Sequence, residues 1–499
     1  MRVPLPPRLF AATLATAAAL ANPVNAADPP FYSGGVPDLP EIGESAAAVL
    51  TPAQEKRLGQ AFMRSVRASE KVLADPLLVD YLQSLGSRLA AKAEAAGQSF
   101  TFFAIDDPNI NAFAGPGGHI GVNTGLILAT ENENELAAVL AHEIAHVTQK
   151  HLLRTFEAAS SLTLPQAAVL LAAVILGTAA GGGAGLAAAL GGQAALLQQR
   201  INFTRSNEEE ADRVGMQILA KSSFDPRAMP SFFERMGRSG QAYATQLPEF
   251  LRTHPVTTSR IADAQGRAEN YSYRQRPDDL RYHLARAALQ AQQPRTAQEA
   301  VANFRSTMRQ GRYSQEAAER YGYAVALLRA RDHEGARREI DQLRSADPSR
   351  VEYVVTSARL HAAAGNRERG LAELEQGLKG SPSSYPLRLE LAEAALAAGR
   401  PARAREALEP LLRSRSDQPE VMRLMARAAA GSGRAAQGHR YQAEYYYLTG
   451  AVESAVQQLE IALRDPGLDF QQSSIIEARL REVREEAADL KKEKKRTGR

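Results

Sequence analysis

The chain has 499 residues, of which 44% are hydrophobic and 23% are charged, and it contains neither cysteine nor tryptophan. This composition is typical of folded proteins and excludes a disordered chain or a protein with many membrane spans. The lack of cysteine excludes disulfide bonds, thiolate catalysis, lipoprotein acylation and cysteine-ligated zinc, so any metal site must use His, Asp and Glu. The formal net charge of +4 is too small for this length to indicate a nucleic-acid partner.

The N terminus has the pattern of a secretory signal peptide. Arg2 and Arg8 precede an apolar run over residues 9–20, and residues 24–26 (VNA) suit cleavage after Ala26. This run is too short for a membrane anchor, which needs roughly 20 apolar residues. We therefore expect residues 1–26 to direct export and residues 27–50, rich in Pro, Gly and Ser, to form an extended leader.

An α+β region, mostly helical and with a small sheet, is expected over residues 51–275. The tetrapeptide TPAQ at 51–54 has the pattern of a capping box and predicts the start of a helix. Residues 100–104 (FTFFA) and 120–122 are short β-favouring runs. The segment NAFAGPGGHIGVNTG between and around them is punctuated by Gly and Pro, as in an edge strand or hairpin. Helical periodicity resumes at Glu135.

From Asp278 onward, Ala, Leu, Arg and Glu recur at helical spacing. Glycine, small-residue and apolar registers repeat every 34 residues: Gly365, Gly399 and Gly433; Ala336, Gly370 and Ala404; Ile340, Leu374 and Leu408. An Ala-rich bundle is the alternative, but three agreeing registers favour the tetratricopeptide repeat, which this pattern resembles. We expect an α-helical repeat domain over 276–470, able to dock clients or partners. Residues 471–499 predict a C-terminal helix with a basic, solvated tail.

The segment ELAAVLAHEIAHVTQKH carries an HExxH motif on an apolar helix. His142 and His146 are four residues apart, so both imidazoles lie on one helix face and can bind one zinc ion. Glu143 lies beside that face, where its carboxylate can take a proton from the attacking water. Ordinary helix-face histidines are the alternative, but these polar groups would be costly on an apolar helix without a partner.

A catalytic zinc ion needs a third protein ligand and an open position. The polar run TRSNEEEADRVG enters a helix from Asn207 and offers Glu208, Glu209 and Glu210. The spacing alone leaves the choice among these three carboxylates open. Glu208 and Asp212 share one helix face, so one could bind zinc while the other orients a ligand histidine.

Four motifs together resemble the M48 family of zinc metallopeptidases: HEIAH, NAFAGPGG, EEEAD and THPVTTSR. The resemblance implies one zinc ion per chain, with Glu208 as its third protein ligand. Asp212 takes the family's supporting position, and we assign Asp212 and Glu143 as the catalytic residues. Gly115 and His119 depart from the family's pattern at NAFALPGG, which leaves the shape of the cleft edge open. With export and the repeats, the resemblance implies an endopeptidase for unfolded or misassembled envelope proteins in outer-membrane protein quality control.

The NAFAGPGG segment is expected to supply an edge strand to which an extended substrate adds by backbone pairing. The residues assigned to this edge are Asn111, Ala112, Phe113, Gly117 and Gly118. Such pairing recognises unfolded chains with little side-chain preference.

His254 precedes Pro255, which favours an extended loop conformation. By resemblance His254 faces the active site. Arg260, at the start of the next helical stretch, is assigned with it to the residues that regulate the enzyme or stabilise the transition state. His254 could donate a hydrogen bond to the oxyanion, or it could occupy the open zinc position and hold the enzyme inactive, which we prefer. His151 is interpreted as structural or as a second-layer residue behind the ligands.

Residues 158–199 contain no charged residue. Glycines at 177 and 181–183 leave an uninterrupted apolar piece of only 167–176, too short to span a bilayer. We favour an apolar helix and loop that cover the site or contact a membrane surface peripherally. A transmembrane hairpin and an ordinary core helix are the alternatives.

Two other functions compete with the peptidase. The chain could be a chaperone or assembly scaffold whose repeats contact the outer-membrane assembly machinery while proteolysis is secondary. It could also be an intramembrane-type protease, if 158–199 spanned a bilayer.

Overall fold

The computed structural model describes residues 50–95, 97–152, 164–176, 205–242, 249–272 and 276–496. The expected signal peptide, all of the leader before residue 50, and residues 158–163 and 177–199 of the uncharged segment lie outside these ranges. Within them the chain is mostly helical with one small sheet, as the sequence predicted.

The first described helix, α2 (Pro52–Ser69), begins with the expected capping box. The Thr51 side chain accepts a hydrogen bond from the Gln54 backbone, and the Gln54 side chain accepts one from the Thr51 backbone. Asp75 caps the next helix, α3 (Pro76–Ala90), by accepting hydrogen bonds from two backbone amides. Both helices have proline at their first position, where the missing N–H costs nothing.

The sheet contains β1 (Thr101–Ile105), β2 (Ala112–Gly115) and β3 (His119–Asn123) in the order β1-β3-β2. β1 is parallel to β3, and β2 is antiparallel to it, so β2 lies at an edge. A 3₁₀ turn, η1 (Pro116–Gly118), joins β2 to β3.

Two of the expected edge-strand residues belong instead to that turn. Gly117 and Gly118 have φ of 71° and 77°, a left-handed conformation that side chains disfavour. A Cβ added to Gly118 would lie 2.1 Å from the Ser99 carbonyl oxygen. The turn and its close packing therefore require glycine at both positions. Of the residues assigned to the substrate edge, only those before the turn remain on it.

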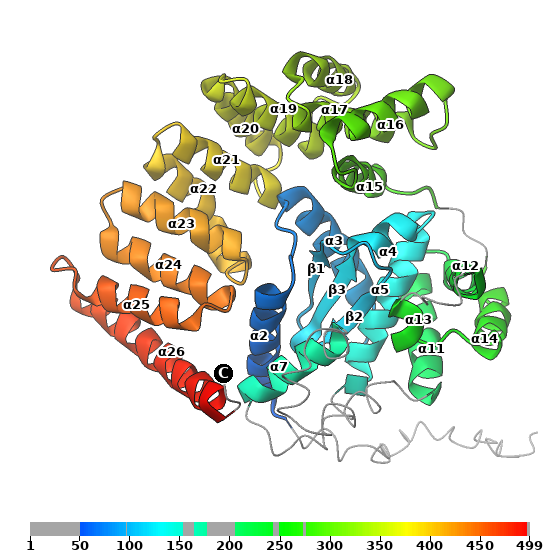
Figure 1. Cartoon of the computed structure of the whole chain (residues 1–499), viewed down its shortest axis with the longest axis horizontal. Coiled ribbons are helices and arrows are strands. Elements are labelled where there is room, and N and C mark those ends of the chain that lie inside the picture. The colour runs from blue at the N-terminus through cyan, green and yellow to red at the C-terminus, as the bar shows by residue number, and fades with distance from the viewer. Residues whose placement is uncertain are drawn as a thin grey trace, which may run out of the picture. The chain divides into compact units, whose positions relative to one another are not determined.

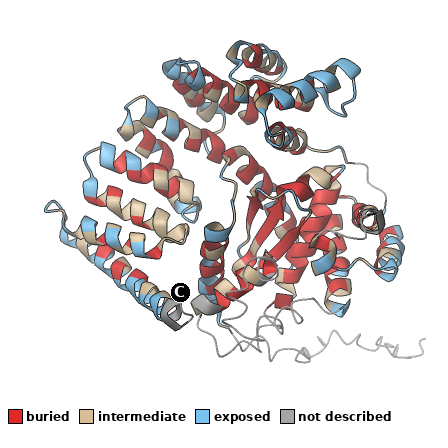
Figure 2. Ribbon diagram, in the orientation of Figure 1, coloured by how far each residue is buried: buried red, intermediate tan, exposed pale blue. Residues whose placement is uncertain are grey.

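Helices pack around the sheet and enclose its core. They are α4 (Thr124–Ala129), α5 (Glu133–Thr148), α11 (Arg205–Lys221), α12 (Ala228–Ala242), α13 (Glu249–Thr253) and α14 (Thr258–Glu269). Most side chains of α5 are buried, including both histidines of the motif. Figure 2 shows the buried residues concentrated on the sheet and on α5.

The described part of the uncharged segment forms α7 (Leu164–Ile175). Its side chains at Ala168, Leu171 and Ile175 are buried in a core cluster with Phe62 of α2 and Phe113 of β2. For residues 164–176 this burial supports the core-helix alternative. The preferred expectation, an apolar helix and loop over 158–199 that cover the site or contact a membrane surface, stays a prediction. Among the helices of the described ranges, none has the length and hydropathy to cross a membrane.

The C-terminal region is a series of helices packed on their chain neighbours (Figure 1). They are α15 (Leu280–Gln292), α16 (Ala297–Gln310), α17 (Glu316–Arg329), α18 (His333–Ala346), α19 (Val351–Ala363), α20 (Arg367–Gly380), α21 (Tyr385–Ala397), α22 (Pro401–Ser414), α23 (Pro419–Gly431), α24 (Ala435–Leu448), α25 (Val452–Leu463) and α26 (Phe470–Arg496).

The three glycines of the 34-residue register each lie in a turn between helices. Gly365, Gly399 and Gly433 have φ of 84°, 70° and 75°, which explains why glycine recurs there. The apolar register is buried, with Ile340, Leu374 and Leu408 inside the repeat cores.

Ion pairs connect the two regions. Arg359 of α19 donates to Asp75 at the start of α3 over 2.8 Å, and Arg281 of α15 donates to Asp80 of α3 over 2.8 Å. At the other end, Arg64 of α2 pairs with Glu486 of α26. The repeats are thus joined to the peptidase-like region through its first two described helices.

Candidate metal centre

Two helices, α5 and α11, carry the acidic and imidazole groups of the site. Gly215 of α11 lies so close to α5 that an added Cβ would be 3.2 Å from the backbone nitrogen of His142. This close approach brings Glu208 and Asp212, both on α11, against the HExxH face of α5. The glycine in the run EADRVG is therefore part of how the site is assembled.

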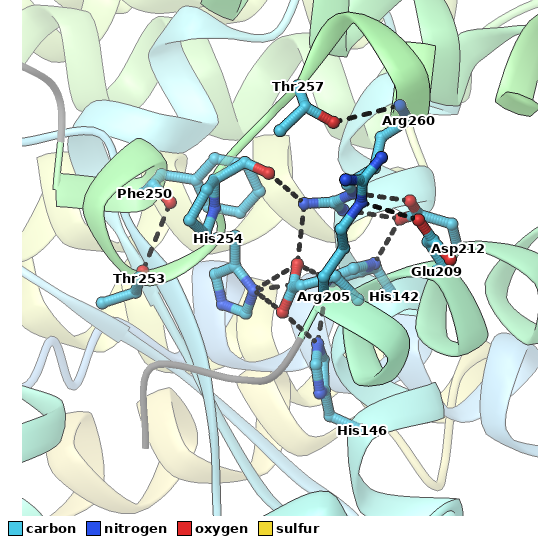
Figure 3. Close-up of polar contacts among 12 residues, drawn as sticks. His142, His146, Arg205, Glu209, Asp212, Phe250, Thr253, His254, Thr257 and Arg260 are labelled. Carbon is cyan, nitrogen blue, oxygen red and sulfur yellow. Dashed lines mark hydrogen bonds and ion pairs between the residues drawn. The ribbon is translucent and has the colours of Figure 1, made fainter. Parts of the chain in front are cut away.

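Four side chains converge at the centre: His142, His146, Glu208 and His254 each offer a ligand atom, and these atoms all lie within 4.8 Å of one another. The Nε2 atoms of His142 and His146 are 2.9 Å apart. Glu208 Oε1 lies 3.4 Å from His146 Nε2, and Glu208 Oε2 lies 3.5 Å from His142 Nε2. Figure 3 shows the three imidazoles directed toward one another.

Glu143 lies beside these four side chains but is not one of them. Its side chain is fully buried. His254 Nε2 lies 3.6 Å from Oε1, and the backbone amide of Ala114 lies close to the carboxylate. A carboxylate fully removed from water is costly, so its presence here indicates a group with a chemical task.

Asp212 and Arg260 form a buried pair behind the ligands (Figure 3). Arg260 donates two hydrogen bonds of 2.8 Å to the two Asp212 oxygens and lies 2.8 Å from Glu208 Oε2. Asp212 Oδ1 lies 3.0 Å from Nδ1 of His142. Asp212 thus orients His142, and Arg260 contacts both Asp212 and Glu208. Asp212 and Arg260 therefore support the ligands from behind.

The carboxylates make the imidazole pair strongly attractive to a cation. Burial would lower the pKa of His142, but Asp212 and Glu208 outweigh burial and raise that pKa to about 10. Burial would raise the pKa of Glu208, but the imidazoles hold it well below its usual value. Two nitrogens and one ionised oxygen directed at one point form a donor set that suits zinc, so these residues fit a bound metal ion.

Glu143 has the opposite electrostatic environment. Burial raises the pKa of Glu143, and His254, His142 and the nearby backbone amide of Ala114 offset only part of this effect. A raised carboxyl pKa suits a group that must both accept and return a proton near neutral pH.

His254 enters the centre from a different element. It follows α13, and its backbone N–H donates to the Phe250 carbonyl over 2.7 Å. Its Nδ1 lies 3.0 Å from Glu208 Oε1 and 3.4 Å from His142 Nε2. His254 is buried, so this loop histidine reaches the ligand atoms themselves.

The edge strand of the sheet, β2, lies beside this site. The backbone N–H of Asn123 donates to the Asn111 carbonyl over 2.9 Å, so Asn111 faces β3. Because backbone groups alternate in direction along an antiparallel strand, Ala112 and Ala114 direct theirs away from β3. The influence of the Ala114 amide on Glu143 places this side of β2 next to the Glu143 carboxylate.

The structure thus brings His142, His146, Glu208 and His254 together, with Glu143, Asp212 and Arg260 around them. The two neighbouring acids of the EEE run lie elsewhere: Glu209 pairs with Arg205 over 3.1 Å, and Glu210 contacts His151. His151 contacts His146 over 2.8 Å, which agrees with its interpretation as a second-layer residue behind the ligands.

A mostly helical domain with a small sheet and an HExxH donor cluster has the character of a metallopeptidase. Residues 76–268 match the family model described as Peptidase family M48, and residues 361–428 match the one described as Tetratricopeptide repeat. The chain therefore carries an M48 metallopeptidase domain followed by tetratricopeptide repeats.

Relatives with known names resemble much of the chain. A β-barrel assembly-enhancing protease of Escherichia coli (strain K12) is 34% identical over 325 residues, which are 65% of this chain and 66% of the relative. The protein of that name from Yersinia pestis is 34% identical over 316 residues, 63% of this chain and 65% of the relative. A Vibrio cholerae relative is 42% identical over 252 residues, 50% of this chain and 52% of the relative.

The aligned parts of the chain therefore span between about half and two thirds of these relatives' lengths. Among solved structures, a tetratricopeptide-repeat domain matches at 12% identity with a TM-score of 0.17, covering 73% of this chain and 97% of that one. A TM-score this low supports no structural argument.

Proposed function

We propose that this chain is an exported, zinc-dependent endopeptidase that hydrolyses unfolded or misassembled envelope proteins. The observation that carries the proposal is the convergence of His142, His146 and Glu208 within ligand distance of one another, beside the fully buried Glu143 carboxylate. The names of the relatives support outer-membrane protein assembly as the setting. The motif at residues 1–26 supports the periplasm as the location.

In this mechanism His142, His146 and Glu208 would hold one zinc ion. When bound, zinc would polarise the scissile carbonyl and acidify a water molecule. Glu143 would take the proton of the attacking water on a carboxylate oxygen and then return it to the leaving amine. Asp212 would keep the proton of His142 on Nδ1, 3.0 Å away, so that Nε2 stays free to bind.

Zinc analysis of the purified full chain, together with hydrolysis of casein as an unfolded protein, tests the proposal. We expect about one zinc ion per chain and hydrolysis that stops on addition of a chelator and returns with zinc. A chain that binds no zinc, or that hydrolyses casein equally well in chelator, would contradict it.

The preferred role of His254 is to hold the enzyme inactive by supplying a fourth ligand. Its Nδ1 lies among the ligand atoms, 3.0 Å from Glu208 Oε1, which supports occupation of the position that a substrate or water needs. Replacing His254 by Ala should then raise the rate of casein hydrolysis at unchanged zinc content. A loss of hydrolysis with zinc retained would instead support donation to the oxyanion.

The substrate is proposed to pair with the edge of β2 as an additional strand. Ala112 and Ala114 are the residues whose backbone groups are directed away from β3, and the turn glycines Gly117 and Gly118 end the edge. The Ala112→Pro variant removes one outward N–H, and we expect kcat/KM for casein to fall about tenfold. Ala112→Gly, which keeps that N–H, is the matched control, and equal activity of both variants would exclude strand pairing at this position.

Clients or partners are proposed to dock on the repeats. A cavity of about 660 Å³ lies between α2 and the helices α22, α23, α24 and α26. Its lining combines arginine, aromatic and apolar side chains, including Arg440, Tyr441 and Ile475. Such a mixed lining suits an extended polypeptide segment. A photo-crosslinker at Tyr441, in the Glu143→Gln background, should capture added unfolded casein, whereas one at the exposed Lys379 should not.

The scaffold alternative makes a different prediction for the same Glu143→Gln chain. If proteolysis is secondary, this variant should support outer-membrane protein assembly as well as the wild type in cells that lack the natural protein. Failure of assembly with Glu143→Gln at wild-type abundance supports the peptidase.

A further inference from the structure

His151 lies beside the metal centre, and no step above uses it. Its ring is fully buried. Its Nδ1 is 2.8 Å from Nδ1 of His146, and its Nε2 is 3.2 Å from Glu210 Oε2. Hydrogen bonds therefore connect Glu210 on α11, through His151, to the far nitrogen of His146 on α5.

The backbone is bent where this contact forms. α5 ends at Thr148, and Lys150 has φ of 55°, a left-handed conformation that is unfavourable for a non-glycine residue. On a continued helix, a residue five positions after His146 would point about 140° away from it. The turn at Lys150 instead directs the His151 side chain back toward His146. The strained backbone at Lys150 therefore makes the buried contact between these two imidazoles possible.

Acid–base chemistry determines the protons along these hydrogen bonds. His146 Nε2 faces the other donors, 2.9 Å from His142 Nε2, so it must be unprotonated to bind a metal ion, and the ring proton stays on Nδ1. That N–H can donate only to an unprotonated Nδ1 on His151. His151 then carries its proton on Nε2 and donates it to the Glu210 carboxylate.

We propose that His151 is a positioning residue that orients the His146 ring and keeps its proton on Nδ1, with Glu210 as the final acceptor. His142 has a corresponding partner in Asp212, 3.0 Å from its Nδ1. The two imidazoles are thus supported differently: one by a carboxylate directly, the other by a carboxylate acting through a histidine. This inference rests on the proposed metal-binding function of the site.

The decisive comparison is between His151→Leu and His151→Asn. The Asn side chain can place its amide oxygen where Nδ1 accepts the His146 proton, whereas Leu cannot accept a hydrogen bond. Zinc affinity of the full chain is measured by competition with a chromophoric chelator. We expect His151→Leu to bind zinc about 10–100-fold more weakly than the wild type, and His151→Asn to restore most of that affinity. Equal affinity of His151→Leu and wild type, or equal weakening by both substitutions, would overturn the inference.

Two matched controls separate positioning from packing. His361→Leu removes a buried imidazole in the repeats and should leave zinc affinity unchanged. Glu210→Gln should weaken zinc binding less than His151→Leu because the glutamine oxygen still accepts a hydrogen bond. Glu209→Gln, its exposed neighbour, should have no effect, and an equal effect of both glutamine substitutions would contradict the role of Glu210.

A measurement on the wild type does not depend on how any variant folds. In the zinc-loaded, ¹⁵N-histidine-labelled chain, the Nδ1–H of His146 should give a slowly exchanging, downfield proton signal. Absence of that signal overturns the inference even if zinc binds. If the wild type binds no zinc at all, the proposed function itself fails.

Discussion

The metal centre and the repeats use their residues in opposite ways. In the centre, a few buried polar groups on α5, α11 and the segment after α13 contact one another, and Glu143 and His254 are each proposed to have a separate chemical task. In α19–α24 the same kinds of residue recur every 34 positions, and stability is spread over many similar apolar contacts. A single substitution should therefore alter chemistry in the first region and only free energy of unfolding in the second.

The largest effect is expected for Glu143→Gln. The amide keeps the volume of the side chain but cannot take a proton, so kcat for casein should fall about 10²–10⁴-fold while zinc content stays the same. Activity and metal analysis on one preparation measure both. Glu209→Gln, whose side chain is exposed and pairs with Arg205, is the control. Full activity in Glu143→Gln would remove this residue from the mechanism.

A large change in stability without a change in chemistry is expected for Leu408→Ala. Leu408 is fully buried in the repeat core, so the free energy of unfolding of the repeats should fall by about 2–5 kcal/mol. Urea unfolding followed by circular dichroism measures this, and kcat of the folded chain should not change. Leu378→Ala, at a half-buried position, should cost less. A loss of kcat with intact folding would mean that the repeats act on the active site directly.

Smaller changes in the free energy of unfolding are expected when two glycines of the repeats are replaced by alanine, and the two changes should have opposite signs. Gly399 has φ of 70°, so Gly399→Ala should lower the free energy of unfolding by about 1–2 kcal/mol. Gly380 is the last residue of helix α20 and has open space around it, so Gly380→Ala should raise stability by up to about 1 kcal/mol. Thermal unfolding of the two variants checks the sign, and the same sign for both would contradict the conformational explanation.

The smallest effect depends on pH. Burial would raise the pKa of Glu373, but the Ser357 hydroxyl, at 2.7 Å, and Arg344, at 3.0 Å, outweigh it and hold the pKa below its usual value of 4.5. A lowered carboxyl pKa adds stability above the unfolded-state pKa, and this stability is lost as the pH falls through the folded-state pKa.

The stability difference between wild type and Glu373→Gln should therefore be about 1 kcal/mol at pH 7 and shrink below about pH 4.5. Urea unfolding at a series of pH values measures it. Glu368→Gln, which alters an exposed pair with Arg400, should show no such trend, and a Glu373→Gln difference that grows in acid would show that the sign is wrong.

The features that the sequence predicted well depend on residues close together in the chain. His142, Glu143 and His146 belong to one helix, so their spacing alone placed them on adjoining faces. The repeat glycines are equally local, because a left-handed turn between helices needs glycine wherever it occurs. The capping box at Thr51 depends on four consecutive residues and forms as predicted.

What the sequence could not decide depends on packing between distant segments. The spacing left Glu208, Glu209 and Glu210 equivalent, and the close approach of α11 to α5 at Gly215 determines which of them meets the histidines. The apolar character of residues 164–176 was recognised correctly, but an apolar surface can be buried by a membrane or by another helix. Here Phe62 of α2 and Phe113 of β2 bury it.

The pair between Arg64 and Glu486 limits the order in which parts of the chain can pack. These residues are 422 positions apart in the chain, so their contact cannot form until almost the whole chain is available to fold. All residues proposed to bind metal or move protons lie before residue 261, and N-terminal domains generally fold first. In a chain exported N-terminus first, the proposed site would be complete while most of the repeats are still crossing the membrane, which gives a direct use to a histidine that keeps the new enzyme silent.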